Sequence, residues 1–297
     1  MAWIECVPNV SEGRRRDVIE RGARAIGDAG AAVLDVSSDP AHNRTVYTFA
    51  HTAETVARAV QALFDAALAS IDLRDHHGEH PRLGAVDVVP FVPLSGVPMS
   101  TCVRAAREVA AAVSERHGLP VYLYEEAALR PERRRLEQIR RGGFEGLAAR
   151  MQQDEWAPDF GPRHPHPSAG ASVIGARRFL IAYNVTLATT RLDIAKRIAA
   201  RIRESSGGLP ALKAMGIALE DRGIVQVSMN LTDFTRTSMP AAFDAVVREA
   251  GACGVAVIDS ELVGLAPADA LSKTIAEHIR LTGFTDDQIL EHRLRRL

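Results

Sequence analysis

Cysteine is scarce in this chain, and the charges nearly cancel. The 297 residues include three cysteines and carry a formal net charge of −1. Cys6, Cys102 and Cys253 lie far apart and form no CxxC pair, which is typical of small buried thiols in a reducing compartment. The near-neutral balance argues against a protein whose binding is dominated by neutralising phosphates, so we expect no nucleic-acid partner.

Long apolar runs are also missing. No stretch approaches the roughly 20 apolar residues that a membrane-spanning helix needs. Glu5 and the arginines at 14–16 interrupt the region where a signal peptide would place its apolar segment. We therefore expect a cytoplasmic protein with no membrane partner. A composition of 46% hydrophobic and 25% charged residues is that of a globular protein with a sizeable core.

Several catalytic motifs are absent from the sequence. There is no GxSxG nucleophile elbow, no Walker phosphate loop and no dinucleotide-binding glycine fingerprint after the first strand. The histidines at 76–80 and the pair His164 and His166 lack the HExxH-type spacing of a catalytic zinc site. These absences argue against ATP-driven, nicotinamide-dependent and serine-nucleophile chemistry, and we expect no metal.

The pattern of apolar residues predicts two similar halves. In the first half the predicted strands are 3–10, 31–36, 45–50, 86–93 and 121–124, and the predicted helices are 14–28, 53–71, 100–117 and 131–149. In the second half the predicted strands are 179–185, 211–219, 224–230 and 255–258, and the predicted helices are 192–203, 240–250 and 286–297. Both halves therefore contain the order strand, helix, strand, strand, helix, strand.

This repeated order favours an α+β fold with an internal duplication. We expect two sheet-and-helix subdomains, 1–177 and 178–297, each of split βαβ (ferredoxin-like) order, with a ligand cleft or tunnel between them. A weak echo supports the duplication, because PNVS at 8–11 leads into a helix as YNVT at 183–186 does. Ser11 is placed to cap the helix at 14–28.

The loop HHGEHPR at 76–82 is a candidate catalytic segment. It carries three histidines and runs directly into an apolar strand, so its titratable groups are held at one end by a rigid element. His80 follows Glu79, a candidate partner, and precedes Pro81, which biases it toward an extended backbone. An imidazole with an ordinary pKa of about 6.5 exchanges protons at neutral pH. We interpret His80 as a general acid–base, with a solvent-exposed surface histidine as the alternative.

Two further stretches are polar in a way that suggests binding. Asp39, His42, Asn43 and Arg44 form one cluster, for which turn chemistry is the alternative explanation. With Arg82, which suits bidentate binding of a carboxylate, they indicate a cation-lined site for an anionic small molecule. The stretch 156–171, WAPDFGPRHPHPSAGA, is either a linker between the halves or a functional loop.

Six segments of the chain resemble the glutamate formimidoyltransferase family, which forms the N-terminal part of formimidoyltransferase-cyclodeaminase in animals. The resemblance implies transfer of the formimino group from N-formimino-L-glutamate to N5 of tetrahydrofolate, in histidine degradation and one-carbon metabolism. The segments are ECVPNVSEG (5–13), HNRTVYTF (42–49), HHGEHPRLGAVDVVPFVP (76–93), LPVYLYEEAA (119–128), EWAPDFGP (155–162) and LVGLAP (262–267).

Carried over position by position, the resemblance assigns roles to individual residues. It makes His80 the catalytic histidine, and it leaves five residues as candidates for binding anions or orienting His80: Asp39, Asn43, Arg44, Glu79 and Arg82. The family's folate loop falls on Gly161, Pro162, Arg163, His164, Pro165, His166, Pro167, Ser168, Ala169 and Gly170. Of these, 163–167 depart from the animal pattern.

The resemblance also implies partners. Tetrahydrofolate is the expected co-substrate, no metal is expected, and a homodimer of two α/β subdomains per chain is implied. The length suggests a stand-alone transferase that works with a separate cyclodeaminase. Three alternatives stay open: a 5-formyltetrahydrofolate-recycling formyltransferase at the same site, a metal-dependent formiminoglutamate hydrolase, and a non-catalytic folate-binding protein.

Overall fold

The computed structural model describes residues 2–78, 81–94, 96–219 and 222–297. The chain forms two compact units, residues 1–177 (unit 1) and residues 178–297 (unit 2). Among the helices of these residues, none has both the length and the apolar character that crossing a membrane requires. The ligand cleft predicted between the halves stays a prediction.

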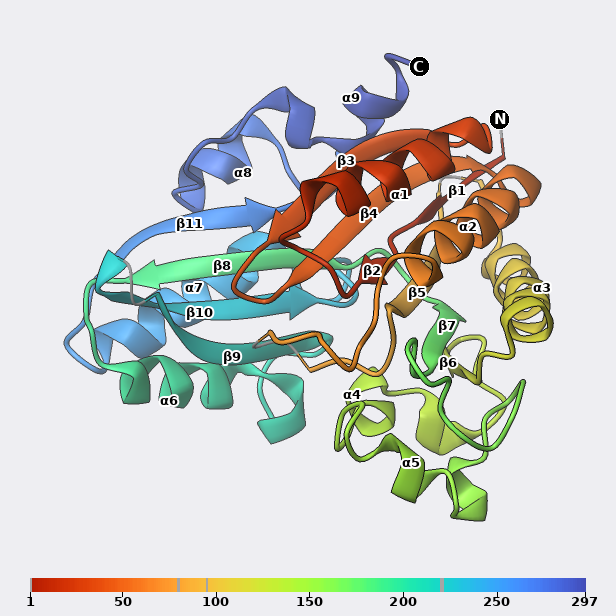
Figure 1. Cartoon of the computed structure of the whole chain (residues 1–297). Helices are drawn as coiled ribbons and strands as arrows, with labels where there is room; N and C mark the ends of the chain where they lie inside the picture. Colours follow the sequence, from red (N-terminus) through yellow and green to blue (C-terminus); the bar gives the residue numbers. More distant parts are fainter. Residues whose placement is uncertain (1, 79–80, 95, 220–221) are drawn as a thin grey trace. The chain divides into compact units, whose positions relative to one another are not determined.

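Unit 1 begins with the predicted split βαβ order (Figure 1). Its strands β3, β4, β1 with β2, and β5 lie side by side in that order, and each adjacent pair is antiparallel. Helices α1 and α2 pack against each other and against this sheet. The elements are β1 (Trp3–Cys6), β2 (Asn9–Val10), α1 (Arg16–Asp28), β3 (Ala32–Asp39), β4 (Arg44–Thr52), α2 (Ala53–Leu68) and β5 (Val86–Pro93).

The remainder of unit 1 extends the sheet beyond β5. Helix α3 (Met99–His117) leads to β6 (Val121–Glu125), and β7 (Ser172–Ala176) inserts between β5 and β6, parallel to both. The sequence analysis missed β7. This strand is short and buried along its whole length, so it shows no alternation of apolar and polar residues. It also contains Gly175, where a Cβ atom would lie 2.3 Å from the carbonyl oxygen of Tyr124.

Two predictions in unit 1 are wrong in detail. The charged stretch 131–149 is not one helix but three short pieces, η1 (Pro131–Arg133), α4 (Leu136–Ile139) and α5 (Leu147–Arg150). Gly142 and Gly143 separate the last two, with φ of 83° and 60°, values that a helix does not contain. Ser11 does not cap α1, because its hydroxyl donates instead to the carbonyl oxygen of Gly84, 2.8 Å away.

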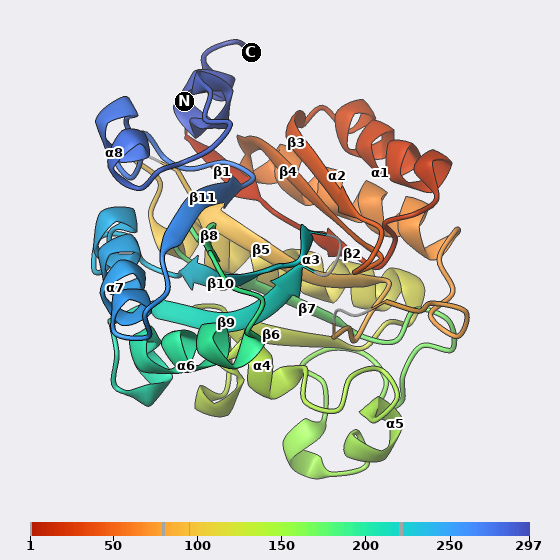
Figure 2. The same ribbon diagram turned by 90° about the vertical axis from the view of Figure 1, so that its left-hand side faces the viewer.

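Unit 2 has the same split βαβ order without the extension (Figure 2). Its antiparallel sheet has the strand order β11-β8-β10-β9. Helices α6 and α7 pack against each other and cover the sheet. The elements are β8 (Ile181–Leu187), α6 (Leu192–Ile202), η3 (Glu204–Ser206), β9 (Leu212–Leu219), β10 (Ile224–Leu231), α7 (Met239–Gly251) and β11 (Val257–Val263).

The last part of unit 2 differs from its prediction. Helix α8 (Lys273–His278) was not predicted, since six residues are too few to show a helical period. The predicted helix at 286–297 is broken into η5 (Asp286–Gln288) and α9 (Leu290–Leu294). The α+β fold with a repeated order of elements is otherwise confirmed, and each unit packs its apolar helix faces on its own sheet to form its own core.

Candidate functional site

Three loops of unit 1 meet at one place: the segments 11–15, 39–44 and 76–78, with Arg82 bonded to the carbonyl oxygen of His76. Two glycines make the close approach feasible. A Cβ atom on Gly13 would lie 2.3 Å from the carbonyl oxygen of Asp39, and one on Gly78 would lie 2.3 Å from that of His42. Neither distance leaves room for a side chain. The two polar clusters that the sequence analysis treated separately are therefore brought together, and the segment 11–15 joins them.

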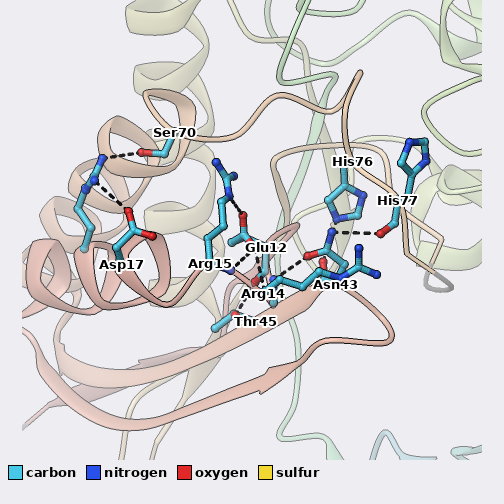
Figure 3. Close-up of polar contacts among 11 residues, drawn as sticks. Glu12, Arg14, Arg15, Asp17, Asn43, Thr45, Ser70, His76 and His77 are labelled. Atoms are coloured by element: carbon cyan, nitrogen blue, oxygen red, sulfur yellow. Dashed lines mark hydrogen bonds and ion pairs between the residues drawn. The ribbon is translucent and has the colours of Figure 1, made fainter.

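Asn43 ties the three loops to one another (Figure 3). Its side-chain oxygen accepts from the N–H of Gly13 at 2.9 Å, and its amide nitrogen donates to the carbonyl oxygen of His77 at 3.1 Å. Its own carbonyl oxygen accepts from Nε2 of His76 at 2.9 Å. Asn43 is buried and has φ of 48°, a left-handed conformation that asparagine tolerates better than most residues. Its amide is thus occupied in orienting the loops.

Glu12 is a buried residue of the site that the sequence analysis did not single out. Its Oε1 accepts from the backbone N–H groups of Arg14 and Arg15, each at 2.9 Å, and its Oε2 pairs with the guanidinium of Arg15. Burial raises the pKa of Glu12, but these hydrogen bonds and the ion pair outweigh it and hold the pKa below its usual value. The only signal in the sequence was its place in the segment ECVPNVSEG.

His76 is the buried histidine of the candidate catalytic loop. A carbonyl oxygen can only accept, so the bond to Asn43 fixes the proton on Nε2 and leaves the lone pair on Nδ1. That Nδ1 atom is buried and has no hydrogen-bond partner among the residues the structure describes. Burial, helped by the charge of Arg82, holds the pKa of His76 below its ordinary value. His77, by contrast, is exposed.

Two arginines of the site, Arg82 and Arg140, pair with carboxylates. Arg82 donates from Nη2 to Glu145, 3.0 Å away, and to the carbonyl oxygen of His76, also at 3.0 Å. Arg140 forms an ion pair with Asp87, which is almost fully buried. Burial and the charge of Arg140 together lower the pKa of Arg44 to about 10, against the opposing charges of Asp87 and Asp39. The lining is therefore nearly charge-balanced rather than strongly cationic.

Asp39 lies at the exposed edge of this cluster. It pairs with His42 at 2.9 Å and accepts from the backbone N–H groups of Ala41 and His42. Burial raises the pKa of Asp39, but those hydrogen bonds and the charge of His42 keep it below its ordinary value. A narrow concavity lies inside the cluster, and its lining residues are Ser11, His42, Asn43, Arg44, His76, Arg82 and Asp87.

The predicted catalytic residue His80 and its candidate partner Glu79 lie outside the described residues. The chain on either side of them is held firmly. His76 is bonded to Asn43, and the N–H of Leu83 donates to Oδ1 of Asp87 at 2.8 Å. The described residues on either side of His80 are thus bonded to Asn43, immediately before β4, and to Asp87 in β5.

The predicted folate loop is anchored at its beginning by a buried ion pair. Asp159 pairs with Arg133 at 2.9 Å, with side chains 3% and 1% exposed, and accepts from the N–H of Leu123 at 2.7 Å. Arg133 also donates to the carbonyl oxygens of Glu155 and Ala157. This clamp, made by a residue of η1, fixes the chain immediately before Gly161. It was not foreseen because Arg133 and Asp159 are far apart in the sequence.

The end of the folate loop contacts residues that flank the histidine loop 76–82 on either side. The carbonyl oxygen of Ser168 accepts from the N–H of Leu73 at 2.7 Å, and that of Ala169 accepts from the N–H of Ala85 at 3.0 Å. At Gly170, with φ of 68°, a Cβ atom would lie 2.1 Å from the carbonyl oxygen of Leu83. Ser168, Ala169 and Gly170 are therefore brought beside the loop that carries His80.

The middle of the folate loop is less closely tied to the cluster. Arg163 pairs with Asp154 at 2.7 Å on the surface, and His164 is exposed. His166 accepts at Nδ1 from the N–H groups of Ser168 and Ala169. Burial lowers the pKa of His166, and His117 lowers it further.

Metal binding receives no support from the described residues, which contain no group of three or more His, Cys, Asp or Glu side chains placed to hold an ion. Among the described residues, the donors near the concavity are instead engaged with one another. His42 binds Asp39, Asp87 binds Arg140, and Glu12 binds Arg15.

Comparison with known proteins places this arrangement in a family. The model described as "Formiminotransferase domain, N-terminal subdomain" matches residues 3–177, and the model described as "Formiminotransferase domain" matches residues 182–292. The chain belongs to the formiminotransferase family. The N-terminal subdomain of that family ends at Arg177, which is also where unit 1 ends.

Three relatives show how far the similarity to this family extends. A protein from Streptococcus pyogenes serotype M1 named glutamate formimidoyltransferase is 44% identical over 98% of this chain and 98% of its own length. One of the same name from Thermoplasma acidophilum is 46% identical over 100% and 98%. The formimidoyltransferase-cyclodeaminase of Sus scrofa is 45% identical over 90% of this chain and 51% of its own length.

Proposed function

We propose that this protein transfers the formimino group from N-formimino-L-glutamate to N5 of tetrahydrofolate, giving 5-formimidoyltetrahydrofolate and L-glutamate. One observation carries the proposal: the two relatives named glutamate formimidoyltransferase match over nearly the whole of this chain and of their own lengths. The enzyme is then a one-carbon transferase, and tetrahydrofolate is its co-substrate.

The cluster in unit 1 suits these substrates. Both are anions, and the planar guanidinium groups of Arg44 and Arg82 match a carboxylate. The carboxylates beside those arginines make the lining nearly neutral, which suits formiminoglutamate because its amidine group is cationic when protonated. Holding two reactants in line removes entropy from the barrier, worth up to about 7–11 kcal/mol in well-oriented cases.

His80 is the proposed acid–base. The lone pair of N5 attacks the amidine carbon, and a tetrahedral intermediate forms. N5 must then lose a proton, and the departing glutamate nitrogen must gain one. A single histidine performs both transfers in turn, a contribution of about 10²- to 10⁴-fold. Asp39 or Glu79 orients it, and Asn43 holds the loop through His76 and His77.

The folate loop is the proposed site for the second substrate. Its residues are Gly161, Pro162, Arg163, His164, Pro165, His166, Pro167, Ser168, Ala169 and Gly170. Its end is hydrogen-bonded to Leu73 and Ala85, which flank the histidine loop, and this supports folate binding near His80. No metal takes part in this mechanism, because a protonated amidine carbon is already electrophilic.

We also propose a cytoplasmic homodimer whose product passes to a separate cyclodeaminase. The two named transferases support the last point, since each is matched over 98% of its own length. Size-exclusion chromatography with light scattering tests the dimer, and a monomer at micromolar concentration would contradict it.

The test of the function is a coupled assay on the purified protein. Release of glutamate from N-formimino-L-glutamate is followed with and without tetrahydrofolate, and with and without a chelator. We expect release that requires tetrahydrofolate and ignores the chelator. Release without folate that the chelator abolishes indicates the metal-dependent hydrolase. Formation of N-formylglutamate from 5-formyltetrahydrofolate and glutamate, with no formimino transfer, indicates the formyltransferase. Folate binding by calorimetry without release indicates a binding protein.

A further inference from the structure

Arg82 and Glu145 form an ion pair whose two partners lie at different depths. The side chain of Arg82 is 14% exposed and that of Glu145 is 67% exposed, with 3.0 Å between Nη2 and Oε1. The carboxylate of Glu145 therefore reaches from the surface to a guanidinium that is mostly buried. Because Glu145 itself is in contact with solvent, the face of Arg82 that it covers is accessible to another carboxylate.

Arg82 is held in place by contacts other than Glu145. Its Nη2 also donates to the carbonyl oxygen of His76 at 3.0 Å. Its guanidinium carbon lies 5.9 Å from the centre of the Phe144 ring, within the range at which a cation is attracted to an aromatic face. The guanidinium therefore keeps its position when Glu145 moves away.

Glu145 is the partner that is able to move. It lies in a turn closed by a hydrogen bond from the N–H of Gly146 to the carbonyl oxygen of Gly142, 3.0 Å long, so the backbone of the turn does not depend on the ion pair. A Cβ atom on Gly143 would lie 3.0 Å from Oε2 of Glu145, and glycine leaves that space open beside the carboxylate. An exposed side chain also loses conformational entropy when it is held in a pair.

The pair lies beside the end of the proposed folate loop. A Cβ atom on Gly170 would lie 3.0 Å from Cδ2 of Phe144, the residue before Glu145. The N–H of Ala171 donates to the carbonyl oxygen of Leu83, the residue after Arg82, at 3.0 Å. Both proposed substrates bring carboxylates to this region, one on the glutamate part of formiminoglutamate and one on the glutamyl tail of folate.

We propose that Glu145 is an internal competitor, whose carboxylate occupies the position at Arg82 that a substrate carboxylate takes when it binds. The inference rests on the proposed function and adds to it a residue that sets substrate affinity. The exchange replaces one carboxylate by another, so the charge balance around Arg82 is the same before and after binding. A substrate carboxylate that aligns both oxygens with the guanidinium binds more strongly than Glu145 does through Nη2 and Oε1.

Two variants of Glu145 and one matched control test this exchange. Glu145→Gln keeps the size of the side chain and removes its charge, and Glu145→Ala removes the side chain. Glu126→Gln removes the same charge from another pair of unit 1, in which Glu126 lies 3.3 Å from Arg134 and both partners are exposed. The control therefore reports the effect of net charge alone. The substrates are N-formimino-L-glutamate, tetrahydrofolate and tetrahydropteroate, which lacks the glutamyl tail.

In both Glu145 variants we expect the KM of the substrate that binds Arg82 to fall by about 2- to 5-fold, the value of an exposed ion pair. A fall for N-formimino-L-glutamate identifies its glutamate part as the occupant. A fall for tetrahydrofolate, absent for tetrahydropteroate, identifies the folate tail. Glu126→Gln keeps the wild-type KM values. In an Arg82→Ala background, Glu145→Gln changes no KM, because the position for which it competes is gone.

The outcomes are distinct from failure of the proposed function. A wild-type protein that transfers no formimino group rejects the proposed function itself. In an active wild type, KM values that stay the same or rise in Glu145→Gln overturn the competition. An equal fall in Glu126→Gln, an equal fall for tetrahydrofolate and tetrahydropteroate, or a fall that persists without Arg82 overturns it as well. Where Glu145→Ala fails to fold, Glu145→Gln decides, and calorimetric titration with each substrate alone measures the same change as a Kd.

Discussion

The two units share one order of elements, yet the same short sequence pattern has different outcomes in them. In unit 2, YNVT lies within the continuous strand β8, where Thr186 accepts from Gln226. In unit 1, PNVS begins with Pro8, which has no N–H for a sheet ladder. The strand is interrupted there, and Ser11 leaves the sheet to donate to Gly84. The chain rejoins the same sheet as β2 and leaves it at Ser11, immediately before Glu12.

The units also differ in where they keep their charges. In the described part of unit 1, Arg133 with Asp159 and Arg140 with Asp87 are largely buried. The described ion pairs of unit 2 keep at least one partner well exposed, as Arg201 does with Glu249. Burying charge is expensive unless the partners are well paired. A protein that does so is fixing the positions of loops, and in unit 1 these are the loops of the candidate site.

The largest expected effect concerns His80. His80→Ala should lower kcat by about 10²- to 10⁴-fold because the proton transfers lose their catalyst. Folate binding, measured by calorimetry, should persist. The matched control in unit 2 is His278→Ala, which removes an exposed partner of Asp244 and should leave kcat unchanged. Wild-type turnover in His80→Ala would refute the assignment.

The buried clamp should dominate stability. Arg133→Met should lower the free energy of unfolding by about 3–5 kcal/mol, because Asp159 is left as a buried charge without its partner. In unit 2, Arg201→Met breaks an exposed pair and should cost at most about 1 kcal/mol. Urea titration gives both values. Similar losses in the two variants would mean that the buried pair has no special role.

Two asparagines, one in each unit, allow a sharper comparison. Asn43→Ala removes two side-chain hydrogen bonds and puts alanine at φ of 48°, so we expect a loss of about 2–3 kcal/mol. Asn184→Ala removes one bond to Glu261 and should cost about 1 kcal/mol. Glycine adopts the same φ without strain, so Asn43→Gly measures the loss of the hydrogen bonds alone. If Asn43→Ala unfolds no more easily than Asn184→Ala, the loops are held by other contacts.

A smaller effect is expected at Arg82. Arg82→Ala should raise the KM for an anionic substrate by about 10-fold, the value of a hydrogen bond to a charged group, with a lesser change in kcat. Arg191→Ala, which breaks an exposed pair with Asp193 in unit 2, is the control. Steady-state kinetics with both substrates measure this change, and an unchanged KM for each would mean that Arg82 does not bind a substrate.

The smallest expected effect is a difference in pH dependence. His76, His117 and His166 lie in unit 1, and burial is the main cause of the lowered pKa of each. Their unfolded forms bind protons more readily. The stability they contribute is therefore complete above the ordinary histidine pKa of about 6.5 and is lost as the pH falls through their folded values.

Unit 2 should respond only at lower pH. Asp193 and Glu249 of unit 2 have lowered carboxyl pKa values in the folded state. The stability that they contribute is present above the ordinary carboxyl pKa of about 4 and is lost below it. Both tryptophans, Trp3 and Trp156, lie in unit 1, so tryptophan fluorescence reports its unfolding and far-UV circular dichroism reports both units. When the pH is lowered from 7.5 to 5.5, the urea midpoint measured by fluorescence should fall more than the midpoint measured by circular dichroism. Midpoints that shift together would contradict the difference.

The sequence predicted the fold well where elements are long and periodic. Helix α2 and strand β5 begin at the predicted residues because an amphipathic face or a continuous apolar run marks them. Strand β7 and helix α8 were missed because they are too short to show a period. The helix predicted at 131–149 fails at Gly142 and Gly143, whose positive φ values act locally against the charged helical pattern.

The residue types of the site were predictable from the sequence, but the contacts between them were not. Arg82, Asn43 and Arg44 stood out by residue type, and the structure brings them together. Their partners did not, since Arg82 pairs with Glu145, 63 residues away, and Asn43 with Gly13, 30 residues away. The sheet brings together loops that are far apart in the sequence, so no local sequence pattern predicts the contacts between them. The role of His80 and the folate loop stays a prediction.

The paired glycines have a consequence for protein engineering. At Gly13 and at Gly78 one loop lies against the backbone of another, with no side chain between them to absorb a change. Segments 11–15, 39–44 and 76–78 therefore behave as a single module. Grafting them onto another ferredoxin-like scaffold requires transplanting all three at once, with both glycines and the spacing of strands β2, β4 and β5 intact.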